Sequence, residues 1–268
     1  MKNDDFGDRM KLYESFETNR RTKPLLPVLA RLDGKTFSKF TKGLKRPFDK
    51  RFADLMIEVT EYLITETNAC IGYTQSDEIT LGWHSDSFNS QIYFNGKIFK
   101  MTSTLSAMAS VKFNQLIPKY LPEKISNNTL PIFDCRVWEL PNLIEGANAF
   151  LWRERDAIKN SILNAGHLFL TKSQTFKKST REIKEMLLQK GIDWNDYPDF
   201  FKYGTYIQKR KVMTKFTESE IEKLPLKHEA RKNPNLKILR QKLFKLDIKK
   251  FEDILNRENI IFKGAQLQ

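Results

Sequence analysis

The fold is decided by the stretch Ile71-Gly72-Tyr73-Thr74-Gln75-Ser76-Asp77-Glu78-Ile79-Thr80-Leu81-Gly82-Trp83. Apolar residues on both sides of the acidic pair predict two strands, Cys70–Ser76 and Ile79–Trp83, joined by a tight turn at Asp77-Glu78. An earlier apolar run, Pro27-Val28-Leu29-Ala30-Arg31-Leu32-Asp33-Gly34, predicts another strand that leads into an acidic residue. Asp33 and Asp77 are therefore expected at adjacent tips of one sheet.

Helices are expected before and after the hairpin. Asp49 is suited to cap a helix whose apolar residues recur at helical spacing from Phe52 to Leu63. A second amphipathic helix is expected to begin near Lys97 and to end around Pro118 and Pro122, followed by a strand over residues 130–140. The resulting order β-α-β-β-α-β predicts an α+β fold. It is the ferredoxin-like antiparallel sheet, with two helices on one face, that many polymerases use as a palm.

The rest of the chain is expected to be mostly helical. Residues 1–140 are interpreted as a palm-like catalytic core with an N-terminal helix over residues 6–20, and residues 141–268 as a helical, basic part that completes the core. Within the second part the pattern predicts helices over residues 147–170 and 180–189, a strand over residues 203–212 and a basic helix at about residues 236–246.

The composition favours a basic protein with a real core. The 268 residues are 40% hydrophobic and carry a net charge of +13, which favours polyanionic partners, although a solvated basic surface gives the same count. From Gly204 onward there are 16 Lys and Arg against 8 Asp and Glu. Cys70 and Cys135 form neither a disulfide framework nor a zinc pattern.

With no apolar run of membrane-spanning length and no signal-peptide pattern at Met1–Asp5, a cytoplasmic protein without membrane contact is expected.

The acidic residues predict a metal site. Carboxylates gathered at a sheet edge repel one another unless a cation joins them. Asp33 and Asp77 can bridge two Mg²⁺ ions about 3.5–4 Å apart, an arrangement that acts on nucleotide phosphates. Gly34 would let its carbonyl oxygen approach an ion, and Glu78 is a third ligand or an orienting group. The alternative is that both aspartates are turn residues.

Lysines on the second helix are candidates for the phosphate tail of a nucleotide. Lys97 and Lys100 flank the buried stripe, and the helix is expected to start near the acidic edge. A solvated helix face is the alternative.

Several motifs resemble the tRNA-His guanylyltransferase family. The first is Arg31-Leu32-Asp33-Gly34-Lys35-x-Phe37-x-x-Phe40, followed by Lys45-Arg46-Pro47-Phe48-Asp49. The others are Ser76-Asp77-Glu78, Phe133-Asp134-x-Arg136, Trp152-Arg153-x-x-Asp156-Ala157-x-x-Asn160 and Lys202-x-Gly204-Thr205. They run in order from about residue 10 to residue 212, over most of the chain.

This resemblance implies a palm-like enzyme that adds nucleotides to the 5′ end of tRNA in the 3′–5′ direction with two Mg²⁺ ions and GTP, ATP or other nucleoside triphosphates. It implies catalysis by Asp33, Asp77 and Glu78, with metal ligation by Asp33, Gly34 and Asp77. The expected nucleotide contacts are Arg31, Lys35, Thr36, Phe37, Arg46, Ser76, Lys97, Lys100 and Asn160. The expected tRNA contacts are Arg136, Arg153, Lys209 and Arg210, and the basic part over residues 141–268 is expected to contact tRNA as well. The family usually forms dimers of dimers, so the resemblance also implies a homotetramer.

One departure from the motifs of the eukaryotic enzymes indicates to which branch of the family the chain is more similar. The eukaryotic guanylyltransferases carry His-Ile-Asn-Asn-Leu-Tyr-Asn where this chain has Ile158-Lys159-Asn160-Ser161-Ile162-Leu163-Asn164. The missing histidine makes the chain more similar to the guanylyltransferase-like proteins, which favour template-dependent repair of 5′-truncated tRNA over obligate G addition to tRNA-His.

Two alternatives stay open at this point. Ser76-Asp77-Glu78 at a hairpin also resembles the Gly-Gly-Asp-Glu-Phe signature of diguanylate-type nucleotidyl cyclases, without its paired glycines. A non-catalytic RNA-binding module is the other alternative. Such a module stacks bases on exposed aromatic residues of its sheet, whereas the strands here show Tyr73 and Phe133 without an RNP-type run, and the clustered acidic residues disfavour RNA on this sheet.

Overall fold

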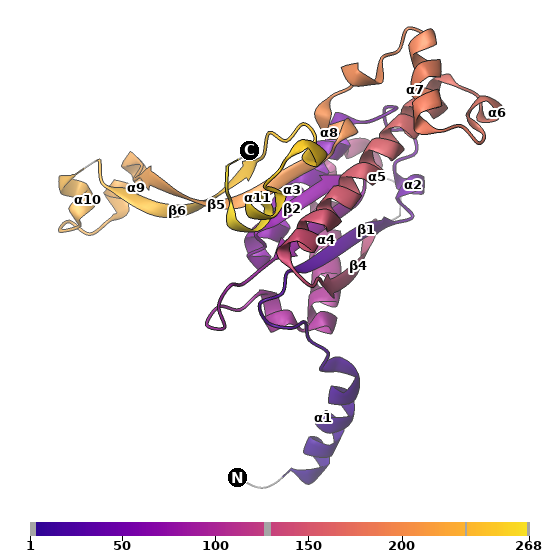
Figure 1. Ribbon diagram of the computed structural model, residues 1–268. Coiled ribbons are helices and arrows are strands. Elements are labelled where there is room, and N and C mark those ends of the chain that lie inside the picture. Colours follow the sequence, from indigo (N-terminus) through magenta and orange to yellow (C-terminus); the bar gives the residue numbers. More distant parts are fainter. Residues whose placement is uncertain (1–3, 126–129, 234, 267–268) are drawn as a thin grey trace.

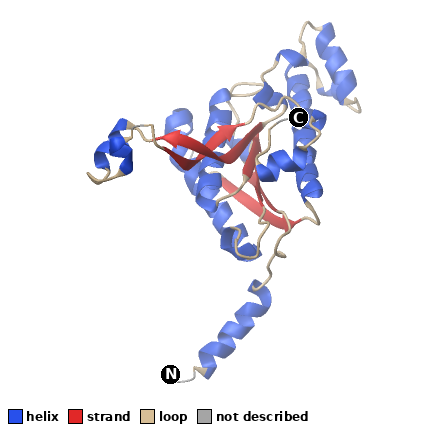
Figure 2. Ribbon diagram, turned by 60° about the vertical axis from the view of Figure 1, so that its left-hand side comes forward, coloured by secondary structure: helices blue, strands red, loops and turns tan. Residues whose placement is uncertain are grey.

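A six-stranded antiparallel sheet forms the centre of the protein, with strand order β4-β1-β3-β2-β5-β6 (Figures 1 and 2). The computed structural model describes residues 4–125, 130–233 and 235–266. Most of the segment at Met1–Asp5 thus lies outside the described residues. The strands are β1 (Val28–Lys35), β2 (Ile71–Gln75), β3 (Glu78–Trp83), β4 (Ile132–Glu139), β5 (Thr205–Lys215) and β6 (Lys237–Lys245).

The predicted β-α-β-β-α-β order is confirmed by the first four strands and two long helices, α3 (Lys50–Thr67) and α4 (Ile98–Tyr120). Both helices cover one face of the sheet, and α3 is capped by Asp49, whose side chain accepts a hydrogen bond from the Arg51 amide. Alternate residues of β1 point into this layer and are fully buried there. The apolar strand that alternates faces therefore supplies one half of the main core.

The opposite face is covered by the long helix α5 (Leu143–Phe169) together with the C-terminal helix α11 (Arg257–Lys263). Leu29 of β1, Tyr73 of β2 and Tyr206 of β5 belong to this second core cluster. β1 therefore contributes buried side chains to both faces of the sheet. The helix expected over residues 147–170 is thus confirmed, with a start four residues earlier.

The C-terminal part holds one element that the sequence pattern misplaced. The basic helix expected at about residues 236–246 is wrong, because this segment forms β6 and pairs with β5 over nine residue pairs, from Ile207 with Lys245 to Lys215 with Lys237. The apolar residues of this segment are spaced in a way that fits a helix as well as a strand. The segment is extended because it pairs with β5. β5 pairs with β2, so a strand from the second half of the chain continues the palm sheet. The division into two parts at residue 140 stays a prediction.

Two segments extend away from the central layers. The hairpin of β5 and β6 projects as an arm with α9 (Glu218–Lys223) and α10 (Glu229–Lys232) at its tip, and the N-terminal helix α1 (Asp5–Thr18) projects separately (Figure 1). Helix α1 has no buried residue. Among the described residues, none of the helices is both long and apolar enough to span a bilayer. The shorter helices are α2 (Phe37–Phe40), α6 (Lys172–Thr175), α7 (Thr180–Gln189), α8 (Asp199–Lys202), α9 (Glu218–Lys223) and α10 (Glu229–Lys232).

Candidate active site

Acidic side chains meet at the end of the sheet where β1 arrives and β3 begins. In the strand register, Asp33 lies opposite Glu78 of β3 and opposite Asp134 of β4. Directly paired residues share a face of the sheet, and this is the face covered by α5. Asp77 lies in the turn, where its carbonyl oxygen accepts a hydrogen bond from the Gly34 amide at 3.1 Å. The expected adjacency of the two acidic tips is therefore confirmed, with the turn at Ser76-Asp77 and Glu78 already in β3.

The two aspartates lack a cationic side-chain partner among the described residues. Neither Asp33 nor Asp77 forms an ion pair with any of the described residues. Burial raises the pKa of the half-buried Asp77 carboxyl, and the nearby negative charge of Asp33 contributes to this rise. Two carboxylates in this situation are electrostatically unsatisfied, which is the condition that a bound cation relieves.

Glu78 differs from the aspartates because it has a dedicated partner. Arg153 of α5 donates from Nε to Glu78 Oε1 at 2.5 Å and from Nη2 to Oε2 at 2.9 Å, and Nη1 reaches Asp156 at 2.7 Å. Burial raises the pKa of Glu78, while the guanidinium opposes that rise. The tRNA contact expected of Arg153 is not supported, since its side chain is only 10% exposed and its donors are occupied.

Gly34 and Phe37 are placed for packing. A Cβ on Gly34 would lie 2.4 Å from the Phe37 ring, so a glycine is required by this close approach. Phe37 is 2% exposed and packs against the rings of Phe113 and Phe133 at centroid distances of 5.0 Å. The nucleotide contact expected of Phe37 therefore cannot come from its side chain. Lys35 and Thr36, just before it, have exposed side chains.

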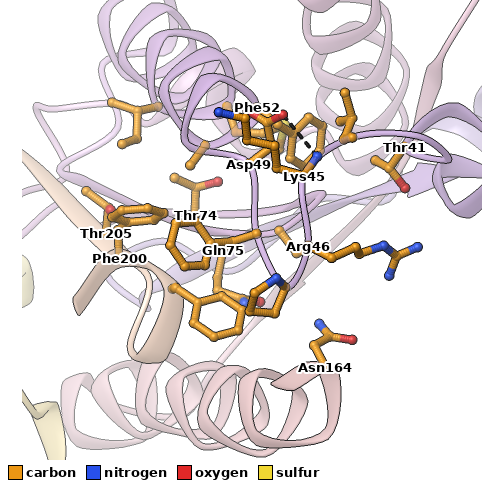
Figure 3. Close-up of a pocket in the computed structure, with 18 residues that line it drawn as sticks. Thr41, Lys45, Arg46, Asp49, Phe52, Thr74, Gln75, Asn164, Phe200 and Thr205 are labelled. Carbon is orange, nitrogen blue, oxygen red and sulfur yellow. Dashed lines mark hydrogen bonds between the residues drawn. The ribbon is translucent and has the colours of Figure 1, made fainter. Parts of the chain in front are cut away.

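A pocket opens beside the acidic turn, towards β2 and β5 (Figure 3). It is open to solvent at its mouth, and its walls come from segment 41–57, β2, β5, α8 and one residue of α5. Two of the expected nucleotide contacts, Arg46 and Ser76, line it. Asn160 does not, and Asn164, one turn further along α5, takes that place. The other lining residues include Lys45, Phe48, Asp49, Phe52, Thr74, Gln75, Phe200, Phe201 and Thr205.

The aromatic wall of this pocket was not foreseen from the sequence. Phe48 packs against Phe200 and Phe201 at centroid distances of 5.3 and 5.0 Å. The adjacent phenylalanines after Pro198 were the available signal, but nothing local links them to residue 48. Asp49 at the back of the pocket is held by Arg51, whose hydrogen bonds lower the pKa of its carboxyl.

The lysines expected to hold a phosphate tail lie at the wrong end of the sheet. Chain direction explains the error: β3 leads away from the acidic turn, so α4 must begin at the far end and return. Lys97 forms a β-bridge with Arg21, which precedes β1, and Ile98 donates to the Arg20 carbonyl. From Val28, at the start of β1, to Asp33 the strand rises about 17 Å, at 3.3 Å per residue. Within one copy of the chain, Lys97 and Lys100 are therefore remote from Asp33.

The remaining basic candidates fall into two groups. Arg136 of β4 is 55% exposed and lies opposite Arg31 of β1, next to the acidic row. Lys209 and Arg210 lie at the root of the arm, where they donate to Asn68 Oδ1 at 2.7 Å and to Gln208 Oε1 at 2.6 Å. Arg136 is thus at the site, whereas the other two are at the far end of the sheet.

A palm-type antiparallel sheet that ends in two aspartates without an ion-pair partner among the described residues, next to an open pocket, is the arrangement of a nucleotidyltransferase. The chain belongs to the tRNAHis guanylyltransferase family, whose model matches residues 7–141. This membership separates it from nucleotidyl cyclases and from non-catalytic RNA-binding modules.

Known proteins are similar over most of the chain. Protein R259 of Acanthamoeba polyphaga mimivirus is 32% identical, covering 91% of this chain and 92% of that protein. The tRNA(His) guanylyltransferase of Schizosaccharomyces pombe is 28% identical, covering 74% and 78%. A bacterial tRNA(His) guanylyltransferase-like protein in complex with ATP has a TM-score of 0.70 at 34% identity, covering 76% and 87%. A GTP complex of a protein described in the same words has a TM-score of 0.68 at 29% identity, covering 90% and 91%.

Proposed function

We propose that this protein adds nucleotides to the 5′ end of tRNA in the 3′–5′ direction, using a template base on the opposite strand. The observation that carries the proposal is the pair of unneutralised carboxylates, Asp33 and Asp77, held together at the end of a palm sheet next to a pocket. The related bacterial proteins solved with ATP and with GTP support nucleoside triphosphates as substrates.

The side chains at the acidic turn fit magnesium. Mg²⁺ prefers oxygen ligands and keeps water and phosphate oxygens in its shell, so it needs few protein groups. Asp33, Asp77 and the Gly34 carbonyl oxygen would hold it. Among the described residues, no cluster of three or more His, Cys, Asp or Glu side chains is arranged as a metal site. When bound, Mg²⁺ neutralises phosphate charge and lowers the pKa of an attacking hydroxyl.

The protein side chains would then position the reactants. Arg46 and Ser76 line the pocket beside the turn and offer donors to phosphate oxygens, while the aromatic wall offers apolar contact to a base. Glu78 is fixed by Arg153 beside Asp33. We assign Glu78 the role of orienting the acidic group, because its carboxylate cannot turn without breaking two hydrogen bonds.

The reaction consistent with this arrangement joins a nucleotide to an activated 5′ end. The 3′-hydroxyl of the incoming nucleotide attacks the 5′ phosphorus of the tRNA, which carries a triphosphate or has been activated with ATP or GTP. The new phosphodiester bond forms as the bond to the leaving group breaks, and the hydroxyl proton leaves to solvent. The added nucleotide retains its own 5′ triphosphate, so the chain grows at its 5′ end.

The basic surface supports a tRNA substrate. With a net charge of +13, the protein gains affinity for RNA through release of counterions. Arg136 next to the acidic row, and Lys209 and Arg210 at the root of the arm, are the side chains that we assign to tRNA.

A nucleotide-addition assay tests the function. Labelled tRNA lacking its first nucleotide is incubated with each nucleoside triphosphate, with an intact or a substituted template base opposite the gap. Extension by the complementary nucleotide alone supports template-dependent repair. Addition of G to tRNA-His regardless of the opposite base supports guanylyltransferase activity instead, and no extension of any tRNA contradicts the proposal.

We also propose a homotetramer and a cytoplasmic location. The exposed apolar side chains of α1, among them Phe6 at 66% and Phe16 at 73% exposure, support an assembly that would cover them. Light scattering tests the mass of the particle, and microscopy of the tagged protein tests the location.

A further inference from the structure

A tryptophan at the acidic end of the sheet has no role in the site described so far. Trp152 of α5 keeps 49% of its surface exposed. The guanidinium carbon of Arg153 lies 4.4 Å from the centroid of its ring, and that of Arg31 of β1 lies 5.4 Å away. Two cation–π contacts therefore hold a large aromatic surface in place at the edge of the site without burying it.

One donor of Arg31, which lies beside this tryptophan, is unsatisfied in the described structure. Its Nε atom is buried and has no partner among the described residues, and its guanidinium forms no ion pair with them. Buried donors are almost always satisfied, so an unpaired one next to an open surface indicates that an acceptor belongs there. A phosphate oxygen of a ligand is such an acceptor.

The neighbouring strand adds a second guanidinium. Arg136 of β4 lies directly opposite Arg31 on the same face of the sheet and is 55% exposed. Asp33 follows Arg31 by two residues on this face, about 7 Å along the strand. Arg31, Arg136 and Trp152 together form a surface beside the acidic row, which we call the tryptophan shelf.

The shelf and the pocket lie on different sides of the acidic turn. None of the three shelf residues lines the pocket, which is built mainly from segment 41–57, β2, β5 and α8, with Asn164 further along α5. The shelf is built from β1, β4 and α5. Because the catalytic carboxylates lie between them, the two surfaces suit the two components of a transfer reaction, a nucleotide on one side and a nucleic acid end on the other.

We propose that the tryptophan shelf binds the end of the acceptor stem of the RNA substrate. Trp152 stacks on a terminal nucleobase, and Arg31 and Arg136 contact adjacent phosphates. Stacking on an aromatic side chain accepts any base, and guanidinium groups match phosphate geometry. This inference rests on the proposed function, since it assigns a subsite to the same tRNA substrate.

Tryptophan fluorescence tests the stacking directly. The full-length protein is titrated with 5′-truncated tRNA in EDTA, so that binding is observed without reaction. Trp83 and Trp194 are buried at 1% and 4% exposure, and Trp138 is half-buried, so Trp152 should dominate the response. We expect quenching by tRNA in the wild type, no such quenching in Trp152→Phe, and none from ATP alone.

Affinity and kinetics provide the second readout. Trp152→Ala should weaken tRNA binding and raise KM for tRNA about tenfold, which is within the range for one lost base stack, while KM for ATP is unchanged. Trp152→Phe should recover most of the affinity, because a phenyl ring still stacks. Phe88→Ala is the matched control, an exposed aromatic residue in the loop after β3 at the far end of the sheet, and should bind tRNA as the wild type does.

Two outcomes would overturn the inference. One is a Trp152→Ala protein that binds tRNA as tightly as the wild type. The other is an equal loss of ATP affinity, which would assign the shelf to a mononucleotide. The titration in EDTA does not depend on turnover. A wild type that binds tRNA with quenching but adds no nucleotide therefore contradicts the proposed function and leaves the shelf intact.

Discussion

The pair formed by Arg153 and Glu78 makes the sharpest prediction about the site. Replacing Arg153 with alanine removes both hydrogen bonds to the Glu78 carboxylate and the one to Asp156. The two paired side chains are only 10% and 17% exposed, so water cannot readily take the place of the guanidinium. Glu78 is then left as a buried carboxylate beside Asp33.

The expected loss of unfolding free energy in Arg153→Ala follows from this burial. Breaking a buried ion pair from one side costs roughly 3–5 kcal/mol, and we expect about 3 kcal/mol in unfolding free energy because residual exposure softens the loss. Burial already raises the pKa of Glu78, and loss of Arg153 raises it further. A carboxyl whose folded pKa exceeds its unfolded pKa destabilises the fold as pH rises, so the loss should be larger at pH 8 than at pH 5.

Urea unfolding of a matched pair of variants provides the assay. Arg155→Ala, two residues along the same helix, removes an ion pair with Glu252 in which the side chains are 59% and 41% exposed. It should lose less than about 1 kcal/mol. Adding Glu78→Gln to Arg153→Ala should recover part of the stability, because no buried charge then remains. Equal losses in the Arg153 and Arg155 variants, or a strictly additive double variant, would refute the reasoning.

Three further substitutions probe the rest of the account. Asp77→Ala should abolish nucleotide addition on gels of labelled tRNA while leaving tRNA binding on filters largely intact; wild-type turnover would contradict its assignment. Burial raises the pKa of Glu154 from 4.5 to about 7. The unfolding free energy of the wild type should therefore fall by up to about 3 kcal/mol between pH 4.5 and pH 7, and that of Glu154→Gln should not. If the two proteins show parallel pH profiles in thermal unfolding, the raised pKa of Glu154 is excluded. Gly34→Ala should cost about 1–3 kcal/mol in urea unfolding by displacing the Phe37 ring, and an unchanged midpoint would contradict the close packing.

The palm and its acidic turn could be predicted because each depends on local pattern. The stripe from Phe52 to Leu63, the apolar strands and the Ser76-Asp77-Glu78 turn are all visible within about fifteen residues. The strand order follows from this element order with little freedom. The proximity of Asp33 and Asp77 could therefore be predicted from the sequence alone.

The features that were missed depend on contacts between distant segments. Segment 237–245 is a strand only because β5 lies beside it. The role of Arg153 depends on Glu78, which is 75 residues away in sequence. The placement of Lys97 was a different kind of error, since following the chain direction through β3 would have put the start of α4 at the far end.

The most direct test of the account is diffraction from a crystal soaked with Mn²⁺ and GTP. The account predicts anomalous density about 2.1 Å from carboxylate oxygens of both Asp33 and Asp77, with the triphosphate reaching the metal from the side of the pocket. Nucleotide bound in the pocket while both carboxylates stay free of metal would contradict the central claim.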